Sequence, residues 1–175
     1  TIGVLGEKLH IPVYSTQKVH EGIAKCRYIN EKLVNSKRII RKEEEFHIGN
    51  FSITAFDIPH DSTDCVGYHI VFGNHRFTFA SDVGHISDVV AKFIKKANHL
   101  IIEANYDEEM LKYGPYPEYL KERVAGSRGH LSNQEAAEFL ATNYTPELKS
   151  IWLCHLSRDN NHPDLAYKTI DNRLF

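Results

Sequence analysis

Two Gly-Asn turns constrain the fold of this chain more than any other feature of its sequence. Gly49-Asn50 and Gly73-Asn74 each separate two apolar runs, and the second turn lies between Val66–Phe72 and His75–Ala80. A two-residue turn that contains glycine is the usual connection between two antiparallel strands of a hairpin. The first half of the chain is therefore predicted to contain an antiparallel sheet.

The second half has a different pattern, in which helical spacing alternates with short apolar strands. The strands are "HLIIEAN" and "SIWLCHL", and the helices are "SDVVAKFIKKAN", "DEEMLKYG", "LSNQEAAEFLATN" and "NHPDLAYKTIDNRLF". Ser132 and Glu135 form a capping box, which predicts the start of the third helix. Hairpins followed by β-α alternation predict an α/β (α+β) fold in one domain, residues 1–175, with helices packed on a sheet.

Nearer the start, "IPVYS" predicts a short buried strand, and Ser15 or Thr16 is placed to cap the helix that follows it. The block "NSKRIIRKEEE" concentrates opposite charges, and we expect it to form a solvated loop or a sheet edge.

Composition restricts the compartment and the kind of partner. The net charge is −2, so a nucleic acid would have to bind a local basic patch. The odd cysteine count, Cys26, Cys65 and Cys154 without a C-x-x-C pair, favours reduced thiols and a cytoplasmic location over a disulfide framework. The longest apolar run is too short to cross a membrane, so a membrane partner is not expected.

Three strands end in side chains that can bind a metal. His60 follows "FSITAFDIP", Asp82 follows "RFTFAS", and His155 follows "SIWLC". Imidazole and carboxylate are ligands that Zn²⁺ accepts, and one carboxylate can bridge two metal ions about 3.5–4 Å apart. Asp82 suits the bridging place, with one histidine on each side. A turn or capping role for each residue alone remains an open alternative.

Two further residues suggest acid–base chemistry beside a phosphate. Glu103 ends the strand "HLIIE", and His130 comes just before the helix that Ser132 caps. A glutamate that orients a histidine makes a proton donor for a leaving group. The positive N-terminal end of this helix, with Arg128 beside it, is a candidate binding site for a phosphate. Taken alone, Glu103 could be a surface acid and His130 a loop residue.

Five segments taken together resemble the metallo-β-lactamase-fold phosphodiesterases. They are "IPHDSTDCVGY", "FASDVGH", "IIEANYD", "GHLSNQEAAEFL" and "LCHLSRDNNHP", and they occur in the order that is typical of the family. The resemblance is to the bacterial YycJ/WalJ-type exonuclease-like branch, with tRNase Z and RNase J as wider relatives. It implies an αββα sandwich of two sheets between two helical layers.

The resemblance also implies a role for each motif residue. His60 would be a ligand of a first zinc ion, Asp82 the bridging ligand, and His155 a ligand of a second zinc ion, with manganese in place of zinc in some relatives. Glu103 and His130 would protonate the leaving group, while Ser157 and Asn160 would line the substrate site.

One motif of the family does not occur in the sequence. The signature H-x-H-x-D-H supplies most of the metal ligands in relatives, and "TIGVLGEKLHIPVY" resembles the helix and strand that follow it there. We therefore expect the domain to be N-terminally incomplete, with the signature ending just before Thr1. The chain on its own would then bind metal weakly and be inactive, because three ligands do not complete two sites.

The resemblance implies a metal-dependent phosphodiesterase or nuclease that acts on DNA or RNA. A hydrolase of small thioesters, lactones or lactams on the same fold is one alternative, because a fold does not determine the substrate. A non-catalytic binding protein that has lost its metals is another. Homodimer formation through the helices of the fold is left open.

Overall fold

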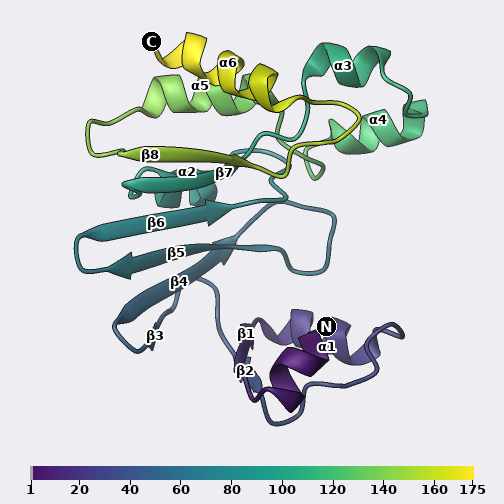
Figure 1. Ribbon diagram of the computed structural model, residues 1–175, viewed down its shortest axis with the longest axis vertical. Helices are drawn as coiled ribbons and strands as arrows, with labels where there is room; N and C mark the ends of the chain where they lie inside the picture. The colour runs from purple at the N-terminus through teal and green to yellow at the C-terminus, as the bar shows by residue number, and fades with distance from the viewer. Residues whose placement is uncertain (1) are drawn as a thin grey trace.

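The structure is a computed structural model that describes residues 2–175 (Figure 1). Its main element is a six-stranded sheet in which the strands follow one another in chain order, from β3 to β8. The strands from β3 to β6 pair antiparallel, whereas β6, β7 and β8 pair parallel. The strands are β3 (Glu45–Ile48), β4 (Phe51–Asp57), β5 (Val66–Phe72), β6 (His75–Ala80), β7 (His99–Glu103) and β8 (Ser150–Cys154).

Both predicted hairpins are present. Gly49 joins β3 to β4 with a φ of 57°, and Gly73 joins β5 to β6 with a φ of 56°. This left-handed conformation costs residues with a Cβ about 1–2 kcal/mol, which explains the glycine at the first position of each turn. The antiparallel half of the sheet thus follows from local turn chemistry.

Helices connect the parallel strands, as the β-α pattern predicts. The helix α2 links β6 to β7, three helices lie between β7 and β8, and α6 follows β8; α5 and α6 lie together beyond β8 (Figure 1). The predicted capping box of Ser132 and Glu135 is confirmed at the start of α5. The helix α4 was not predicted. The helices are α2 (Asp88–Ile94), α3 (Glu108–Tyr113), α4 (Glu118–Val124), α5 (Asn133–Asn143) and α6 (Pro163–Leu174).

The helices α2, α5 and α6 cover one face of the sheet. Leu100 and Ile102 of β7 are fully buried on this face and belong to the same core cluster as side chains of these helices. On the opposite face, Phe79 and Trp152 lie in one row across the strands and are 40% and 49% exposed. The predicted sandwich has four layers, two sheets between two layers of helices. The described residues form one large sheet and the helical layer that covers it.

The residues before β3 form a small unit of their own, drawn in purple in Figure 1. It consists of a π-helical turn η1 (Val4–Lys8), β1 (Val13–Ser15), α1 (Gln17–Lys25) and β2 (Lys37–Ile39), and β1 pairs parallel with β2. The predicted cap is confirmed, since the Thr16 hydroxyl accepts a hydrogen bond from the Val19 amide. The prediction of a buried strand at "IPVYS" is partly wrong, because Ile11 lies outside β1 and is 48% exposed. The charged block predicted as a loop or edge contributes the short strand β2.

No helix within residues 2–175 combines the length and apolar character needed to span a membrane. All three cysteines are free thiols.

Candidate active site

The predicted metal ligands meet at one edge of the sheet. His60 follows β4, Asp82 follows β6, and His155 follows β8. Two antiparallel pairings give β4 and β6 the same direction, and β6 to β8 are parallel. The carboxyl ends of β4, β6 and β8 therefore lie at the same edge, where side chains from distant parts of the chain can converge.

Asp82 lies between the two histidines. Its Oδ1 is 3.7 Å from Nε2 of His60 and 3.5 Å from Nε2 of His155. Asp82 and His155 have φ angles of 57° and 58°, a conformation that is unfavourable for residues with a Cβ and that recurs at functional sites. The structure thus brings together the three predicted ligands, with the carboxylate in the central position.

The other nitrogen of each imidazole is held by a hydrogen bond. Nδ1 of His60 donates to the carbonyl oxygen of Gly129 at 2.8 Å, and Nδ1 of His155 donates to Oε1 of Glu103 at 2.9 Å. Each Nε2 then carries the lone pair and points toward Asp82. This second hydrogen bond is typical of metal-binding histidines, so two imidazoles and a carboxylate form a donor set that fits zinc.

Glu103 is fully buried at the end of β7 and binds two histidines at once. Its Oε1 accepts hydrogen bonds from Nδ1 of His130 at 2.7 Å and from Nδ1 of His155 at 2.9 Å, and its Oε2 accepts one from the Val83 amide. The structure therefore places Glu103 and His130 together, as the sequence predicts. The bond from His155 to Glu103 was not predicted, because nothing in the sequence links residues 52 positions apart.

His130 lies beside the cluster of His60, Asp82 and His155, and its pKa is shifted. Its ring centroid is 5.0 Å from that of His60 and 5.0 Å from that of His155. The hydrogen bond to Glu103 raises the pKa of His130 above its ordinary value, and this effect outweighs the opposing effect of burial. A protonated imidazole beside the cluster is suited to donate a proton.

Arg128 supports the loop that carries His60. Its Nε and Nη2 donate hydrogen bonds of 3.1 and 2.7 Å to the carbonyl oxygen of His60. Two donors of the guanidinium group are thus engaged by the protein itself, and contact of the remaining Nη1 with a phosphate remains a prediction.

A further carboxylate near His60 was missed in the sequence. Oδ1 of Asp61 is 3.5 Å from Nε2 of His60, and Arg123 of α4 donates hydrogen bonds of 2.6 and 3.1 Å to the two Asp61 oxygens. The hydrogen bond from Arg123 lowers the pKa of Asp61. The position of Asp61 directly after His60 was the only signal for it in the sequence. Its partner Arg123 could not be foreseen, because it lies on the helix α4, which was not predicted.

The two predicted substrate-site residues of the last loop differ in exposure. Ser157 is partly exposed, and its hydroxyl accepts a hydrogen bond from the Asn160 amide at 3.2 Å. Asn160 itself is fully buried, and its carbonyl oxygen accepts a hydrogen bond from the Asp107 amide at 2.9 Å. In this structure Asn160 therefore supports the loop. Substrate contact by Ser157 and by Asn160 remains a prediction.

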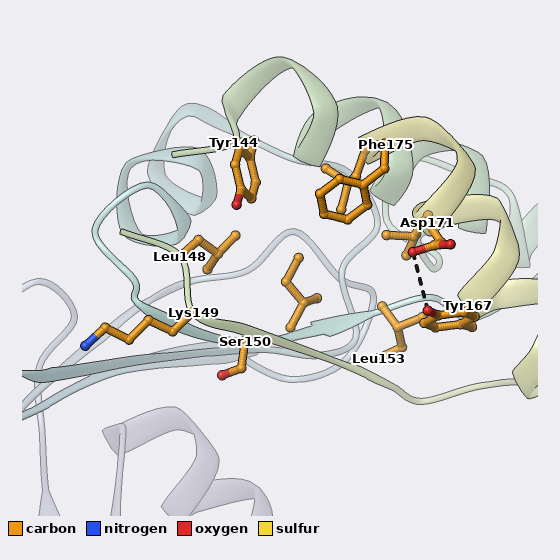
Figure 2. A pocket seen from close by; sticks show the side chains of 11 residues that line it. Tyr144, Leu148, Lys149, Ser150, Leu153, Tyr167, Asp171 and Phe175 are labelled. Carbon is orange, nitrogen blue, oxygen red and sulfur yellow. Dashed lines mark hydrogen bonds between the residues drawn. The ribbon is translucent and has the colours of Figure 1, made fainter. Parts of the chain in front are cut away.

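A separate groove lies on the helix-covered side of β8 (Figure 2). Tyr144, Tyr167 and Phe175 are among the residues that line it, and the Tyr167 hydroxyl donates a hydrogen bond of 3.4 Å to Asp171. None of the predicted site residues lines this groove. The candidate site is therefore the side-chain cluster at the sheet edge.

Comparison of sequences places the chain in a known family. The profile of the beta-lactamase superfamily domain matches residues 3–151. Over 173 residues, the chain is 31% identical to exodeoxyribonuclease WalJ of Streptococcus pneumoniae serotype 2 and 32% identical to exodeoxyribonuclease YycJ of Bacillus anthracis. Each alignment covers 99% of this chain but only 64% and 65% of the two relatives. The chain thus spans slightly less than two thirds of their length.

Solved structures agree with this assignment at the level of the fold. The metallo-β-lactamase fold protein YhfI of Bacillus subtilis aligns with a TM-score of 0.66 at 20% identity, covering 96% of this chain and 62% of that one. Zinc-bound PqqB of Methylobacterium extorquens aligns with a TM-score of 0.68 at 17% identity, covering 98% and 64%. The chain belongs to the beta-lactamase superfamily and has the metallo-β-lactamase fold.

Proposed function

We propose that this chain forms part of a metal-dependent phosphodiesterase that acts on DNA or RNA through a site for two divalent metal ions, zinc first and manganese as the alternative. The observation that carries this proposal is the position of the Asp82 carboxylate between Nε2 of His60 and Nε2 of His155. The names of the relatives, both exodeoxyribonucleases, support a nucleic acid as the substrate.

In this proposal, His60, Asp82 and His155 would hold the ions. Bound divalent ions would lower the pKa of a coordinated water toward neutrality and neutralise charge on the phosphate. The Gly129 carbonyl and the Glu103 carboxylate keep the two rings in the orientation in which Nε2 faces Asp82.

His130 would hold the proton that the leaving oxygen receives. Glu103 accepts the hydrogen bond from Nδ1 of His130, so the proton on Nε2 is the one available to a substrate. Because the pKa of His130 is raised, a larger share of the imidazole is protonated near neutral pH. General acid catalysis of this kind contributes about 10²–10⁴-fold to a rate.

The weak metal binding that we expect of the 175 residues alone follows from the number of ligands they supply. If Asp82 is shared, His60, Asp82 and His155 supply two protein ligands to each ion, whereas zinc sites use about three or four. We therefore retain the proposal that the 175 residues alone bind metal weakly and hydrolyse substrate slowly if at all. A cytoplasmic location, supported by the free thiols, and homodimer formation also remain predictions.

The experiment uses the chain extended to the full length of its relatives and compares two phosphodiesters at millimolar Mn²⁺ or Zn²⁺: a single-stranded DNA oligonucleotide and bis-para-nitrophenyl phosphate. The DNA leaving group is an alkoxide that needs a proton, whereas para-nitrophenolate leaves without one. His130→Ala should therefore lower the rate on DNA by about 10²-fold or more and that on the nitrophenyl ester much less. Asp82→Asn should abolish both rates, and the exposed His47 provides the matched control His47→Ala.

The remaining outcomes distinguish the alternatives. An equal loss on both substrates in His130→Ala would contradict its role as the general acid. Activity on a thioester or lactone without activity on either phosphodiester would favour the small-molecule hydrolase. Absence of all metal-dependent activity, in a chain extended to the full length of the relatives, would favour the binding protein.

A further inference from the structure

A second pair of histidines lies at the opposite end of the sheet from the candidate active site. His75 begins β6 and His99 begins β7, whereas Asp82 and Glu103 lie at the carboxyl ends of these strands. The four-residue separation along β7 corresponds to about 13 Å at the rise of a β-strand. The pair is therefore separate from the cluster around Asp82.

The two rings present nitrogens to each other. Nδ1 of His75 is 3.0 Å from Nε2 of His99, and Nδ1 of His99 is 2.7 Å from the Ser150 hydroxyl. When Nδ1 of His99 donates to Ser150, Nε2 carries the lone pair and faces His75. Phe77 stacks on His99 with the ring centroids 4.6 Å apart, which holds the plane of the imidazole. The contact to Ser150 is the kind of supporting hydrogen bond that orients a metal-binding histidine.

The charge state and the accessibility of the pair also suit a metal. Burial lowers the pKa of His99, and the neighbouring His75 and Lys149 lower it further, which favours the neutral imidazole with a free lone pair. His75 is exposed beside the hairpin turn and can be reached from solvent. The positive charge of Lys149 also opposes a bound cation, so the expected affinity is moderate.

We propose that His75 and His99 bind a divalent transition metal ion of the Cu²⁺ or Ni²⁺ class through Nδ1 and Nε2 respectively. At a metal–nitrogen distance of about 2.1 Å, two nitrogens 3.0 Å apart subtend an angle of about 90° at the metal. Tetragonal Cu²⁺ and Ni²⁺ sites use such an angle, whereas tetrahedral Zn²⁺ needs a wider one. On binding, His75 moves its proton from Nδ1 to Nε2, so that both facing nitrogens carry lone pairs.

The test is calorimetric titration of the full chain with Cu²⁺ or Ni²⁺, in an Asp82→Asn background that weakens the candidate active site. Asparagine is chosen because it tolerates the positive φ of this position. We expect one equivalent to bind, and His75→Ala and His99→Ala each to abolish this binding. Ser150→Ala should weaken it by about 10-fold, as loss of a supporting hydrogen bond does elsewhere. His47→Ala, at an exposed histidine on β3, should bind like its parent.

Electron paramagnetic resonance of the Cu²⁺ form provides the second readout, with hyperfine splitting from two nitrogens expected. His75 lies on the surface, so His75→Ala should keep the circular dichroism spectrum and melting temperature of the parent. Undiminished binding by a folded His75→Ala chain, or an equal loss in His47→Ala, would overturn the proposal.

Discussion

Glu103 orients the rings of two histidines through hydrogen bonds to one carboxylate oxygen. Nδ1 of His130 and Nδ1 of His155 both donate to Oε1, so the same buried charge orients a proposed acid and a proposed metal ligand. The raised pKa of His130 means that this pair stabilises the fold fully below the ordinary histidine pKa of about 6.5. The contribution is lost as the pH rises through the raised value.

The substitution Glu103→Gln should lower the pKa of His130, because the hydrogen bond to the carboxylate is the main cause of the shift. Removing the charge leaves burial as the dominant effect, and burial favours the neutral imidazole. An NMR pH titration of the histidine ring protons measures this change in the metal-free chain. Glu135→Gln is the control, since glutamine preserves the capping box and Glu135 does not perturb His130. An unchanged pKa in Glu103→Gln would contradict the proposed pairing.

At the residue scale, the identities of the site residues could be predicted but not all their contacts. A histidine or an aspartate shortly after an apolar strand is a local signal, and it singled out His60, Asp82 and His155 as candidates. The shared bond to Glu103 depends on the packing of β8 beside β7, which brings His155 to the end of β7. The complete burial of Asn160 was not foreseen, because burial of a polar loop residue leaves no mark in the local sequence.

At the scale of elements, the two types of glycine should respond in opposite ways to the same substitution. Gly73 has a φ of 56° in the β5–β6 turn, Gly22 lies in α1, and an added Cβ would meet no atom within 4 Å at either position. Gly73→Ala should destabilise the chain by about 1–2 kcal/mol through backbone strain alone. Gly22→Ala should stabilise it by up to about 1 kcal/mol through helix propensity.

Urea unfolding monitored by circular dichroism measures both changes. Neither alanine creates a steric clash. The difference in the free energy of unfolding between the two variants therefore reports the effect of backbone conformation alone. A Gly73→Ala chain as stable as the parent would show that the turn does not require the left-handed conformation.

The elements that could be predicted are those with a local signal. The hairpins follow from glycine at the turns, and α5 from the capping box at Ser132. The helix α4 was missed because it is short and begins after Pro117, which provides no side-chain cap. The strand β2 lies in the block predicted as a solvated loop or a sheet edge. The sequence could not choose between the two, because the pairing with β1 joins residues 24 positions apart.

At the scale of the whole molecule, Asp64 joins the small N-terminal unit to the loop that carries His60. It accepts a hydrogen bond from the hydroxyl of Thr16, the cap of α1, and forms an ion pair of 2.7 Å with Lys42. Burial raises the pKa of Asp64, but the hydrogen bonds from Lys42 and Thr16 outweigh it and lower the pKa overall. The contribution of Asp64 to stability is therefore present near neutral pH and lost as the pH falls through the lowered pKa.

The substitution Asp64→Asn should loosen this connection while tolerating the φ of 58° at this position. We expect faster amide hydrogen exchange in β1 and α1, because the charge that binds Thr16 and Lys42 is removed. Exchange in the β5–β6 hairpin should stay unchanged and serves as the internal control. Uniformly faster exchange over the whole chain, or no change in α1, would show that Asp64 is not the connection.

Anomalous diffraction at the zinc absorption edge, from crystals of the chain grown with millimolar zinc, tests the central claim most directly. We predict density within about 2.0–2.2 Å of an Asp82 carboxylate oxygen and of Nε2 of His60 or His155, and its loss in Asp82→Asn. Zinc bound only elsewhere, or density at His60 and His155 that persists in Asp82→Asn, would contradict the account of Asp82 as the shared metal ligand.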